Sequence, residues 1–126
     1  KMIRLMFSRI EEDPGCQALI PVVPMVDTLK VLERKKDDEG NGYLHAVAGR
    51  SVNREDVFGA QTPQIFRAEA IKAAYSQAYS QSFTDDASVA AEYEIPLTFS
   101  EGERLNFKIT SPDDLVLAQA VLSIRK

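Results

Sequence analysis

The amino-acid sequence predicts an α/β domain built around a mixed sheet. Helical and strand-like patterns alternate along the 126 residues, and 44% of them are hydrophobic, which is enough for one domain with a real core. The nearly continuous apolar run Cys16–Val23 is typical of a strand covered on both faces. In residues 105–109 apolar and polar side chains alternate, and a helix start follows at Pro112. We therefore treat residues 1–126 as a single domain.

The first predicted elements are a helix over residues 2–11 and a strand over residues 16–23. The helix ends at Asp13-Pro14-Gly15, because proline and glycine interrupt a helical pattern. Its predicted buried face consists of four apolar residues: Ile3, Met6, Phe7 and Ile10.

Residues 25–53 predict a long hairpin with few apolar side chains of its own. Residues 25–34 and 43–52 are extended patterns, and the charged, glycine-ended stretch 35–42 joins them. An isolated two-stranded ribbon is marginally stable in water. We therefore expect this hairpin to pack on the rest of the domain or on a second subunit.

The second half of the chain predicts three strands and three helices. The expected order is a strand over residues 57–62, helices over 67–81 and 85–92, strands over 95–99 and 105–109 and a helix over 112–124. Thr84 and Ser111 stand where helix N-caps are expected. The inward-facing residues of the last helix are predicted to be Leu115, Ala118, Val121 and Leu122.

Composition and charge exclude several classes of protein. The net charge of −4 argues against a general nucleic-acid binder, and no apolar run approaches the ~20 residues of a membrane span. The single cysteine, Cys16, fits a reducing compartment and a small core position, so we expect a cytoplasmic protein. His45 is the only histidine, so no zinc signature or Ser-His-Asp triad is indicated, and we expect it at the surface or in packing.

Threonines and basic residues are the remaining candidates for chemistry. Lys108 and Thr110 leave a predicted strand on its polar side, beside the amides of a helix start where a phosphate could sit. Hydroxyl, lysine and arginine groups are the donors that a phosphate monoester needs. The other candidates are Thr28, Arg54, Thr62 and Thr84. Strand propensity, helix capping and a solvated lysine are the more frequent explanations of such residues, so composition alone indicates an α/β domain and leaves anion binding open.

Four stretches in this order resemble the 2-C-methyl-D-erythritol 4-phosphate cytidylyltransferase family of the non-mevalonate isoprenoid pathway. They are residues 20–30 (IPVVPMVDTLK), 60–66 (AQTPQIF), 84–88 (TDDAS) and 106–115 (NFKITSPDDL). Pentitol-phosphate cytidylyltransferases, which act on ribitol 5-phosphate, share much of this pattern and are the alternative. A second alternative is a non-catalytic module that dimerises or binds an anion.

The resemblance implies a Rossmann-like nucleotidyltransferase sheet with a protruding β-hairpin arm, matched by residues 25–57, that joins a homodimer. It implies transfer of CMP from CTP to methylerythritol phosphate with Mg²⁺ assistance and release of pyrophosphate. Lys108 and Arg54 match catalytic positions of the family. The residues matching its substrate-phosphate site are Thr28, Arg54, Thr62, Thr84, Lys108 and Thr110. Thr28 and Arg54 would serve the neighbouring subunit's site, and Arg50 is the alternative to Arg54.

The resemblance covers only the later half of the family's chain. The glycine-rich CTP loop, the basic residues that accompany it and a metal-binding aspartate have no counterpart in residues 1–126. We therefore expect a partial domain that is inactive by itself and has no cofactor or metal ligands of its own, with the Mg²⁺ ligands supplied elsewhere. The expected partners are the two small-molecule substrates and a second copy of the protein, without nucleic acid or membrane.

Overall fold

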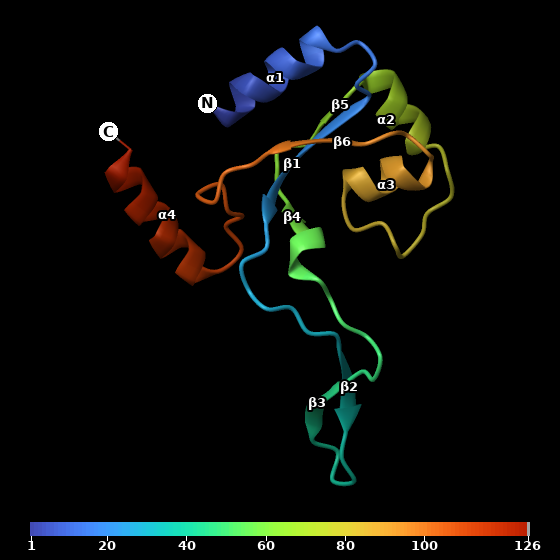
Figure 1. Ribbon diagram of the computed structural model, residues 1–126, viewed down its shortest axis with the longest axis vertical. Helices are drawn as coiled ribbons and strands as arrows, with labels where there is room; N and C mark the ends of the chain where they lie inside the picture. The colour runs from blue at the N-terminus through green and yellow to red at the C-terminus, as the bar shows by residue number, and fades with distance from the viewer. Residues whose placement is uncertain (126) are drawn as a thin grey trace. The chain divides into compact units, whose positions relative to one another are not determined.

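The computed structural model describes residues 1–125 and divides the chain into two compact units. The first unit contains Lys1–Val23 and the chain from Ala60 onward; the second is Pro24–Gly59. The predicted arm, residues 25–57, lies inside the second unit. The helices and strands, labelled in Figure 1, confirm the α/β class. Within residues 1–125, no helix has the length and apolar character that a membrane crossing requires.

Strand β1 (Ala18–Pro24) organises the sheet. It pairs in parallel with β6 (Thr98–Glu101) and antiparallel with β5 (Ile65–Phe66), and β4 (Phe58–Ala60) is its further neighbour. The predicted mixed sheet is therefore confirmed. The short strand β5 was not predicted, because two residues after a proline carry no periodic pattern.

Helix α1 (Met2–Glu12) covers β1 with a face that includes Met6 and Ile10, as predicted, together with Met2. Ile3 and Phe7 are 48% and 52% exposed, so their predicted burial is wrong. Two overlapping stripes of apolar residues fit a 3.6-residue period here, and only the packing against β1 selects between them. The core cluster of this unit consists of Met2, Met6, Ile10, Cys16 and Leu19, with Ile65 packed against it. The core position predicted for Cys16 is confirmed.

Helices α2 (Ala68–Ala74) and α3 (Asp86–Glu92) lie side by side (Figure 1). Ala74 and Ala90 are fully buried, and the Gln77 side chain donates a hydrogen bond to the Val89 carbonyl at 2.9 Å. The helix predicted over 67–81 is shorter than expected, since the backbone leaves the helix in the serine-containing stretch after Tyr75. The helix predicted over 85–92 is confirmed, but the N-cap predicted at Thr84 is wrong: Asp85 caps the helix, because its carboxylate accepts the Ser88 N–H.

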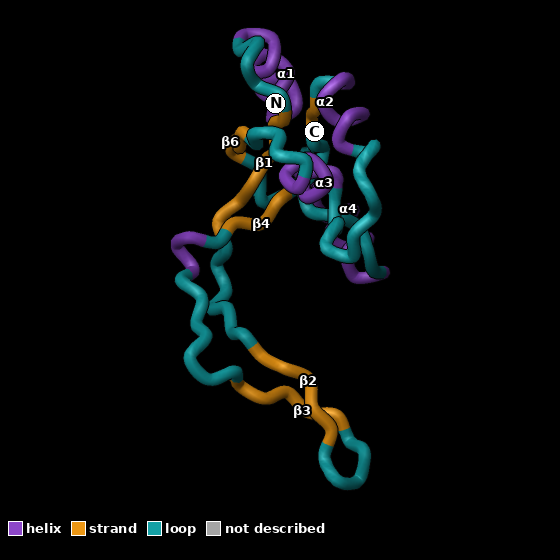
Figure 2. Tube along the Cα trace, turned by 90° about the vertical axis from the view of Figure 1, so that its right-hand side faces the viewer, coloured by secondary structure: helices purple, strands orange, loops and turns teal. Residues whose placement is uncertain are grey.

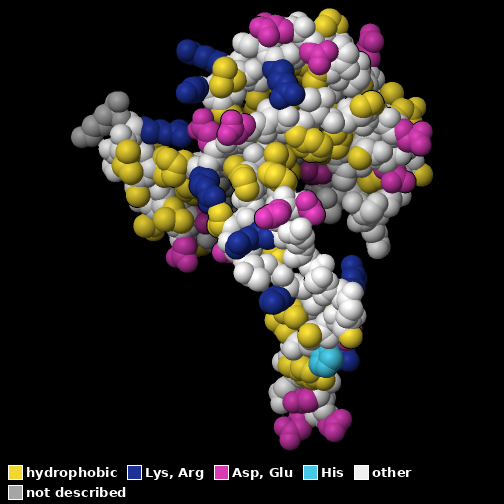
Figure 3. All heavy atoms as spheres, viewed as in Figure 1, with side chains coloured by type: hydrophobic (Ala, Val, Ile, Leu, Met, Phe, Trp, Pro, Cys, Tyr) yellow, Lys and Arg dark blue, Asp and Glu magenta, His cyan; other side chains and the backbone are white. Residues whose placement is uncertain are grey.

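Helix α4 (Pro112–Ile124) has the predicted bounds but no buried residue. The predicted burial of Leu115 and Leu122 is wrong, and Ala118 and Val121 are half-buried. A shallow groove of about 210 Å³ lies where Ala118, Val121 and Leu122 face the apolar side chains of Leu105, Phe107 and Ile109. Hydrophobic side chains gather over this helix in Figure 3. Periodicity therefore located the helix without deciding what it packs on.

The strand predicted over residues 105–109 is wrong. Glu103–Asn106 forms a turn in which the Asn106 N–H donates to the Glu103 carbonyl at 3.0 Å, and residues 106–110 are irregular. A strand is defined by its ladder, and no strand among residues 1–125 pairs with this stretch. Alternation of apolar and polar residues is therefore not sufficient to predict a strand.

The second unit contains an antiparallel hairpin of β2 (Leu32–Lys36) and β3 (Gly42–Ala46), whose two strands and tip are visible in Figure 2. Both strands are shorter than predicted, and every residue in them is exposed. The Asp37 carboxylate closes the tip by accepting hydrogen bonds from the Glu39 and Asn41 amides at 2.9 Å and 2.8 Å. The hairpin has no apolar core of its own.

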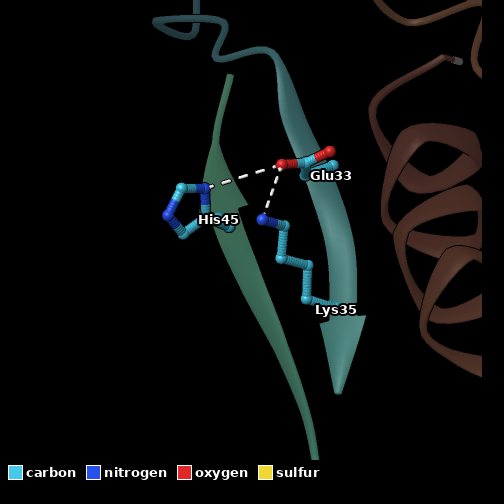
Figure 4. A network of polar contacts seen from close by, with 3 residues as sticks. All are labelled: Glu33, Lys35 and His45. Carbon is cyan, nitrogen blue, oxygen red and sulfur yellow. Dashed lines mark ion pairs between the residues drawn. The ribbon is translucent and has the colours of Figure 1, made fainter. Parts of the chain in front are cut away.

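His45 lies on the surface of this hairpin, as expected. Its Nδ1 is 3.6 Å from the Glu33 carboxylate, which also lies 3.2 Å from the Lys35 ammonium (Figure 4). Glu33 and His45 are directly opposite in the ladder. The first contact is cross-strand and the second lies within β2; both are exposed, so they contribute little to stability.

Candidate functional site

The segment Gln61–Gln64 connects the parts of the first unit that carry predicted site residues. The Gln61 side-chain amide bonds to both backbone groups of one residue: Nε2 donates to the Glu103 carbonyl at 2.7 Å, and Oε1 accepts from the Glu103 N–H at 3.1 Å. Gly102 makes this approach feasible, because a Cβ there would meet Gln61 Oε1 and lie 3.0 Å from the Val22 carbonyl oxygen. Gln61 thus fixes the turn that precedes Lys108.

Asn106 adds a second connection between the same two regions. Its Nδ2 donates to the Thr62 carbonyl at 2.7 Å and lies 3.4 Å from Gln61 Oε1. Asn106 is two residues before Lys108, so these bonds place the backbone leading to Lys108 against the backbone of Thr62.

Gln64 connects the other end of the segment to the start of α3. Its Nε2 donates to the Asp85 carboxylate at 3.0 Å, and its Oε1 accepts from the Ala87 N–H at 3.2 Å. Asp85 is the N-cap and also accepts from the Ser88 N–H at 2.8 Å, while Ser88 Oγ accepts from the Thr84 N–H at 2.9 Å. The first turn of α3, including the backbone of Thr84, is therefore fixed in position.

The charge of Asp85 reflects these contacts. Its partial burial raises the pKa, but hydrogen bonds from Gln64 and Ser88 favour the carboxylate and hold the pKa below its ordinary value of 3.8. The residue is thus an ionised acceptor at neutral pH, as its capping role requires.

The side chains of Thr62, Thr84 and Lys108 are exposed. Within residues 1–125, neither the two hydroxyl groups nor the Lys108 ammonium takes part in a hydrogen bond or ion pair with another residue. Their three backbone segments are connected through Asn106 and Gln64, which contact Thr62 and Asp85. The structure therefore leaves two hydroxyl groups and an ammonium group available on segments that are tied together.

Thr110 is in a different situation. Its hydroxyl and its N–H both donate to the Asp114 carboxylate, at 2.9 Å and 3.0 Å, and the Ser111 N–H donates to the same oxygen at 3.1 Å. These bonds lower the pKa of Asp114. The protein's own carboxylate thus engages the Thr110 and Ser111 amides at this helix start, where a phosphate was expected. A substrate contact of Thr110 stays a prediction.

Thr28 and Arg54 belong to the second unit. Arg54 opens a short 3₁₀ turn (Arg54–Asp56), and its Nη1 donates to the Val26 carbonyl at 2.8 Å, two residues from Thr28. This bond places Arg54 beside the segment that carries Thr28. No corresponding bond within residues 1–125 involves the side chain of Arg50, and the choice between Arg54 and Arg50 as the phosphate contact stays a prediction.

No group of three or more histidine, cysteine, aspartate or glutamate side chains within the described part of the chain is arranged to hold a metal ion. No role was predicted for Gln61, Gln64 or Asn106, although they stand in two of the four stretches that carry the family resemblance. Their partners Glu103, Asp85 and Gln61 lie 21 to 45 residues away along the chain, so the sequence pattern does not show which groups they bind.

The sequence profile of the family described as 2-C-methyl-D-erythritol 4-phosphate cytidylyltransferase matches residues 3–124. The chain belongs to this family. The proposed resemblance is therefore confirmed, and the cytidylyltransferases are nucleotidyltransferases of isoprenoid biosynthesis.

Individual relatives agree with this assignment. The cytidylyltransferase of Bacteroides thetaiotaomicron is 39% identical over 106 residues, which are 84% of this chain and 43% of that protein. A bifunctional enzyme IspD/IspF of Rhizobium leguminosarum is 37% identical over 124 residues, 94% of this chain and 28% of the relative. The crystal structure of the Thermus thermophilus cytidylyltransferase aligns with a TM-score of 0.66 and 31% identity, over 95% of this chain and 55% of that one. The chain thus spans about half the length, or less, of these relatives, and the expected nucleotidyltransferase fold is confirmed.

Proposed function

We propose that this protein supplies the substrate-phosphate side of a 2-C-methyl-D-erythritol 4-phosphate cytidylyltransferase. The reaction transfers CMP from CTP to methylerythritol phosphate and yields 4-diphosphocytidyl-2-C-methyl-D-erythritol and pyrophosphate. Family membership supports the reaction class. The observation that carries the proposal is the pair of links from the Gln61–Gln64 segment to Asn106 and Asp85, which join the backbones of Lys108, Thr62 and Thr84.

In this reaction a phosphate oxygen of the sugar alcohol attacks the α-phosphorus of CTP. A P–O bond forms there, the bond from the α-phosphorus to the oxygen bridging to the β-phosphorus breaks, and pyrophosphate leaves with that electron pair. Two anions must approach one another, so positioning and charge neutralisation are the main requirements. Lys108 supplies the positive charge, and Thr62 and Thr84 donate hydrogen bonds that orient the attacking phosphate.

The second unit is proposed to act in a homodimer. Its hairpin strands have no buried residue, which supports packing against another surface. Arg54 and Thr28 are proposed to reach the phosphate in the neighbouring subunit, with the Arg54–Val26 bond holding the guanidinium near Thr28. Light scattering after size-exclusion chromatography tests this, since a monomeric mass would exclude the arm as a dimer contact. The cytoplasmic location stays a prediction.

Mg²⁺ is proposed to accompany CTP, where a divalent ion neutralises the phosphates. No step is assigned to it in residues 1–125, and its ligands are proposed to come from another part of the enzyme.

A pyrophosphate-release assay tests the proposal. The chain is compared, alone and fused to the segment that precedes the matched region in the Bacteroides thetaiotaomicron relative, with CTP and either methylerythritol phosphate or ribitol 5-phosphate. We expect the fusion alone to be active and to prefer methylerythritol phosphate. Lys108→Ala in the fusion should lower kcat/KM by about 100-fold through lost charge stabilisation. Preference for ribitol 5-phosphate would favour the pentitol-phosphate alternative, and an inactive, folded fusion would contradict the proposal.

A further inference from the structure

Two glutamine side chains, one on either side of Thr62, bond to segments that are distant in the sequence. Gln61 binds both backbone groups of Glu103, and Gln64 binds the Ala87 N–H and the Asp85 carboxylate. Each amide uses its carbonyl as an acceptor and its NH₂ as a donor, so only one orientation of each side chain satisfies both contacts. The two side chains are thus fixed in direction as well as in position.

The backbone between them is anchored to the central strand. The Gln61 N–H donates to the Pro21 carbonyl at 2.8 Å, and Ile65 pairs with Leu19 of β1. The segment is therefore held to the sheet at both ends, and its two glutamines extend from this support to the turn before Lys108 and to the start of α3.

The polar atoms of these side chains are directed at the protein. Gln64 donates to Asp85 and also to the Gln61 carbonyl at 3.4 Å, and its own carbonyl oxygen is engaged by Ala87. Gln61 Oε1 accepts from Glu103 and from Asn106. Groups engaged in this way act on a ligand through the residues they hold.

We propose that Gln61 and Gln64 are positioning residues for the substrate phosphate, holding the segments of Lys108, Thr62 and Thr84 in the arrangement that binds it. This role rests on the proposed function of those three side chains. Displacement by about 1 Å is enough to weaken a multi-point site strongly, because several hydrogen bonds must form at once. Loss of the Gln64 amide releases the first turn of α3, and with it Thr84, from Thr62.

Gln77 provides a matched control. Its Nε2 also donates to α3, at the Val89 carbonyl, but within residues 1–125 its side chain makes no hydrogen bond with residues 84–88. Gln64→Met and Gln77→Met both remove a side-chain amide that bonds to α3 and keep an unbranched side chain of similar length. Only the first releases the turn that carries Thr84.

The test uses the complete ¹⁵N-labelled chain. Calorimetry measures the Kd for methylerythritol phosphate, thermal unfolding measures stability, and NMR records the amide signals of residues 62 and 84–88. We expect Gln64→Met to raise Kd by about tenfold and to shift these amide signals. Gln77→Met should change Kd by less than about twofold at a comparable loss in Tm.

Two outcomes overturn the positioning role: unchanged affinity in Gln64→Met, or equal weakening in both variants, which would report stability alone. Failure of the wild-type chain to bind methylerythritol phosphate at millimolar concentration would instead contradict the proposed function of the site. In that case the NMR measurement still tests the positioning role, independently of substrate binding. Unmoved signals of Thr62 and Thr84 in Gln64→Met overturn the positioning role as well, whereas shifts confined to this variant support it.

Discussion

Helices α3 and α4 begin in the same way. Each has a capping box, formed by Asp85 and Ser88 in α3 and by Ser111 and Asp114 in α4, and each follows a threonine predicted to bind phosphate. Their local sequences therefore specify their starting points equally well.

The two helices differ in what surrounds them. Ala87, Val89 and Ala90 of α3 are buried, and Gln64 bonds to its first turn from outside the helix. No residue of α4 is buried. Caps thus determine where a helix begins, whereas burial and long-range hydrogen bonds determine how firmly its first turn, and any ligand group on it, is held.

The largest difference between the two helices is expected in the stability lost when a valine on each is replaced by alanine. Val89 is 3% exposed and Val116 is 64% exposed. Val89→Ala should lower the free energy of unfolding by about 2 kcal/mol, since it removes two buried methyl groups and leaves a cavity. Val116→Ala should change it by less than about 0.5 kcal/mol. Urea denaturation measures both, and equal losses would contradict the difference in burial.

The two threonines should also differ in substrate binding. The Thr110 hydroxyl donates to Asp114, whereas the Thr84 hydroxyl has no hydrogen-bond partner among residues 1–125. Thr84→Val should therefore raise the Kd for methylerythritol phosphate by about tenfold, the loss of one good hydrogen bond to a charged group. Thr110→Val should raise it by about twofold or less. The reverse order in a calorimetric titration would show that Asp114 releases Thr110 to the substrate.

The caps should contribute unequally to stability. Asp85→Ala removes the acceptor of both Ser88 and Gln64, and we expect a loss of about 1–2 kcal/mol in the free energy of unfolding. Ser111→Ala removes one bond, to Asp114, on a helix without buried residues, and we expect about 0.5–1 kcal/mol. A larger loss for Ser111→Ala in chemical denaturation would mean that α4 is held more firmly than its exposure indicates.

The smallest effect concerns pH. Asp85 and Asp114 both have a pKa lowered from 3.8, so their ionised forms favour the folded state. Their contribution to stability is complete above this value and is lost as the pH falls through the lower folded pKa. Gln64→Met should raise the pKa of Asp85 and leave that of Asp114 unchanged, as carboxyl NMR titration can measure. A rise in the pKa of both Asp85 and Asp114 would show that the substitution loosens the whole fold and not only the start of α3.

Local chemistry made several elements predictable. Ser111 and Pro112 marked the start of α4, and the apolar run from Cys16 marked the central strand. Phosphate-binding candidates were identifiable because threonine, lysine and arginine are the usual donors to a phosphate. Three of them, Thr62, Thr84 and Lys108, lie on segments that the structure connects.

Long-range contacts were not predictable from the same patterns. Alternation in residues 105–109 suggested a strand, but a strand also needs a partner, and the pattern contains no information about one. Thr110 was predicted to bind phosphate, but in the structure its hydroxyl donates a hydrogen bond to the Asp114 carboxylate. Gln61 and Gln64 stand in the stretch AQTPQIF, but their role was not predictable because the groups they bind become adjacent only when the chain folds.

The way these glutamines hold their partners has a consequence for how the sequence can drift over evolutionary time. Gln61 bonds to the backbone of Glu103, and Gln64 to the backbone of Ala87. Every residue except proline offers the same two backbone groups. These hydrogen bonds therefore do not restrict which side chain stands at position 103 or 87, whereas burial does restrict position 87. Among distant descendants, we expect the glutamines to persist while Glu103 is replaced freely, so that comparison of paired substitutions would not reveal this contact.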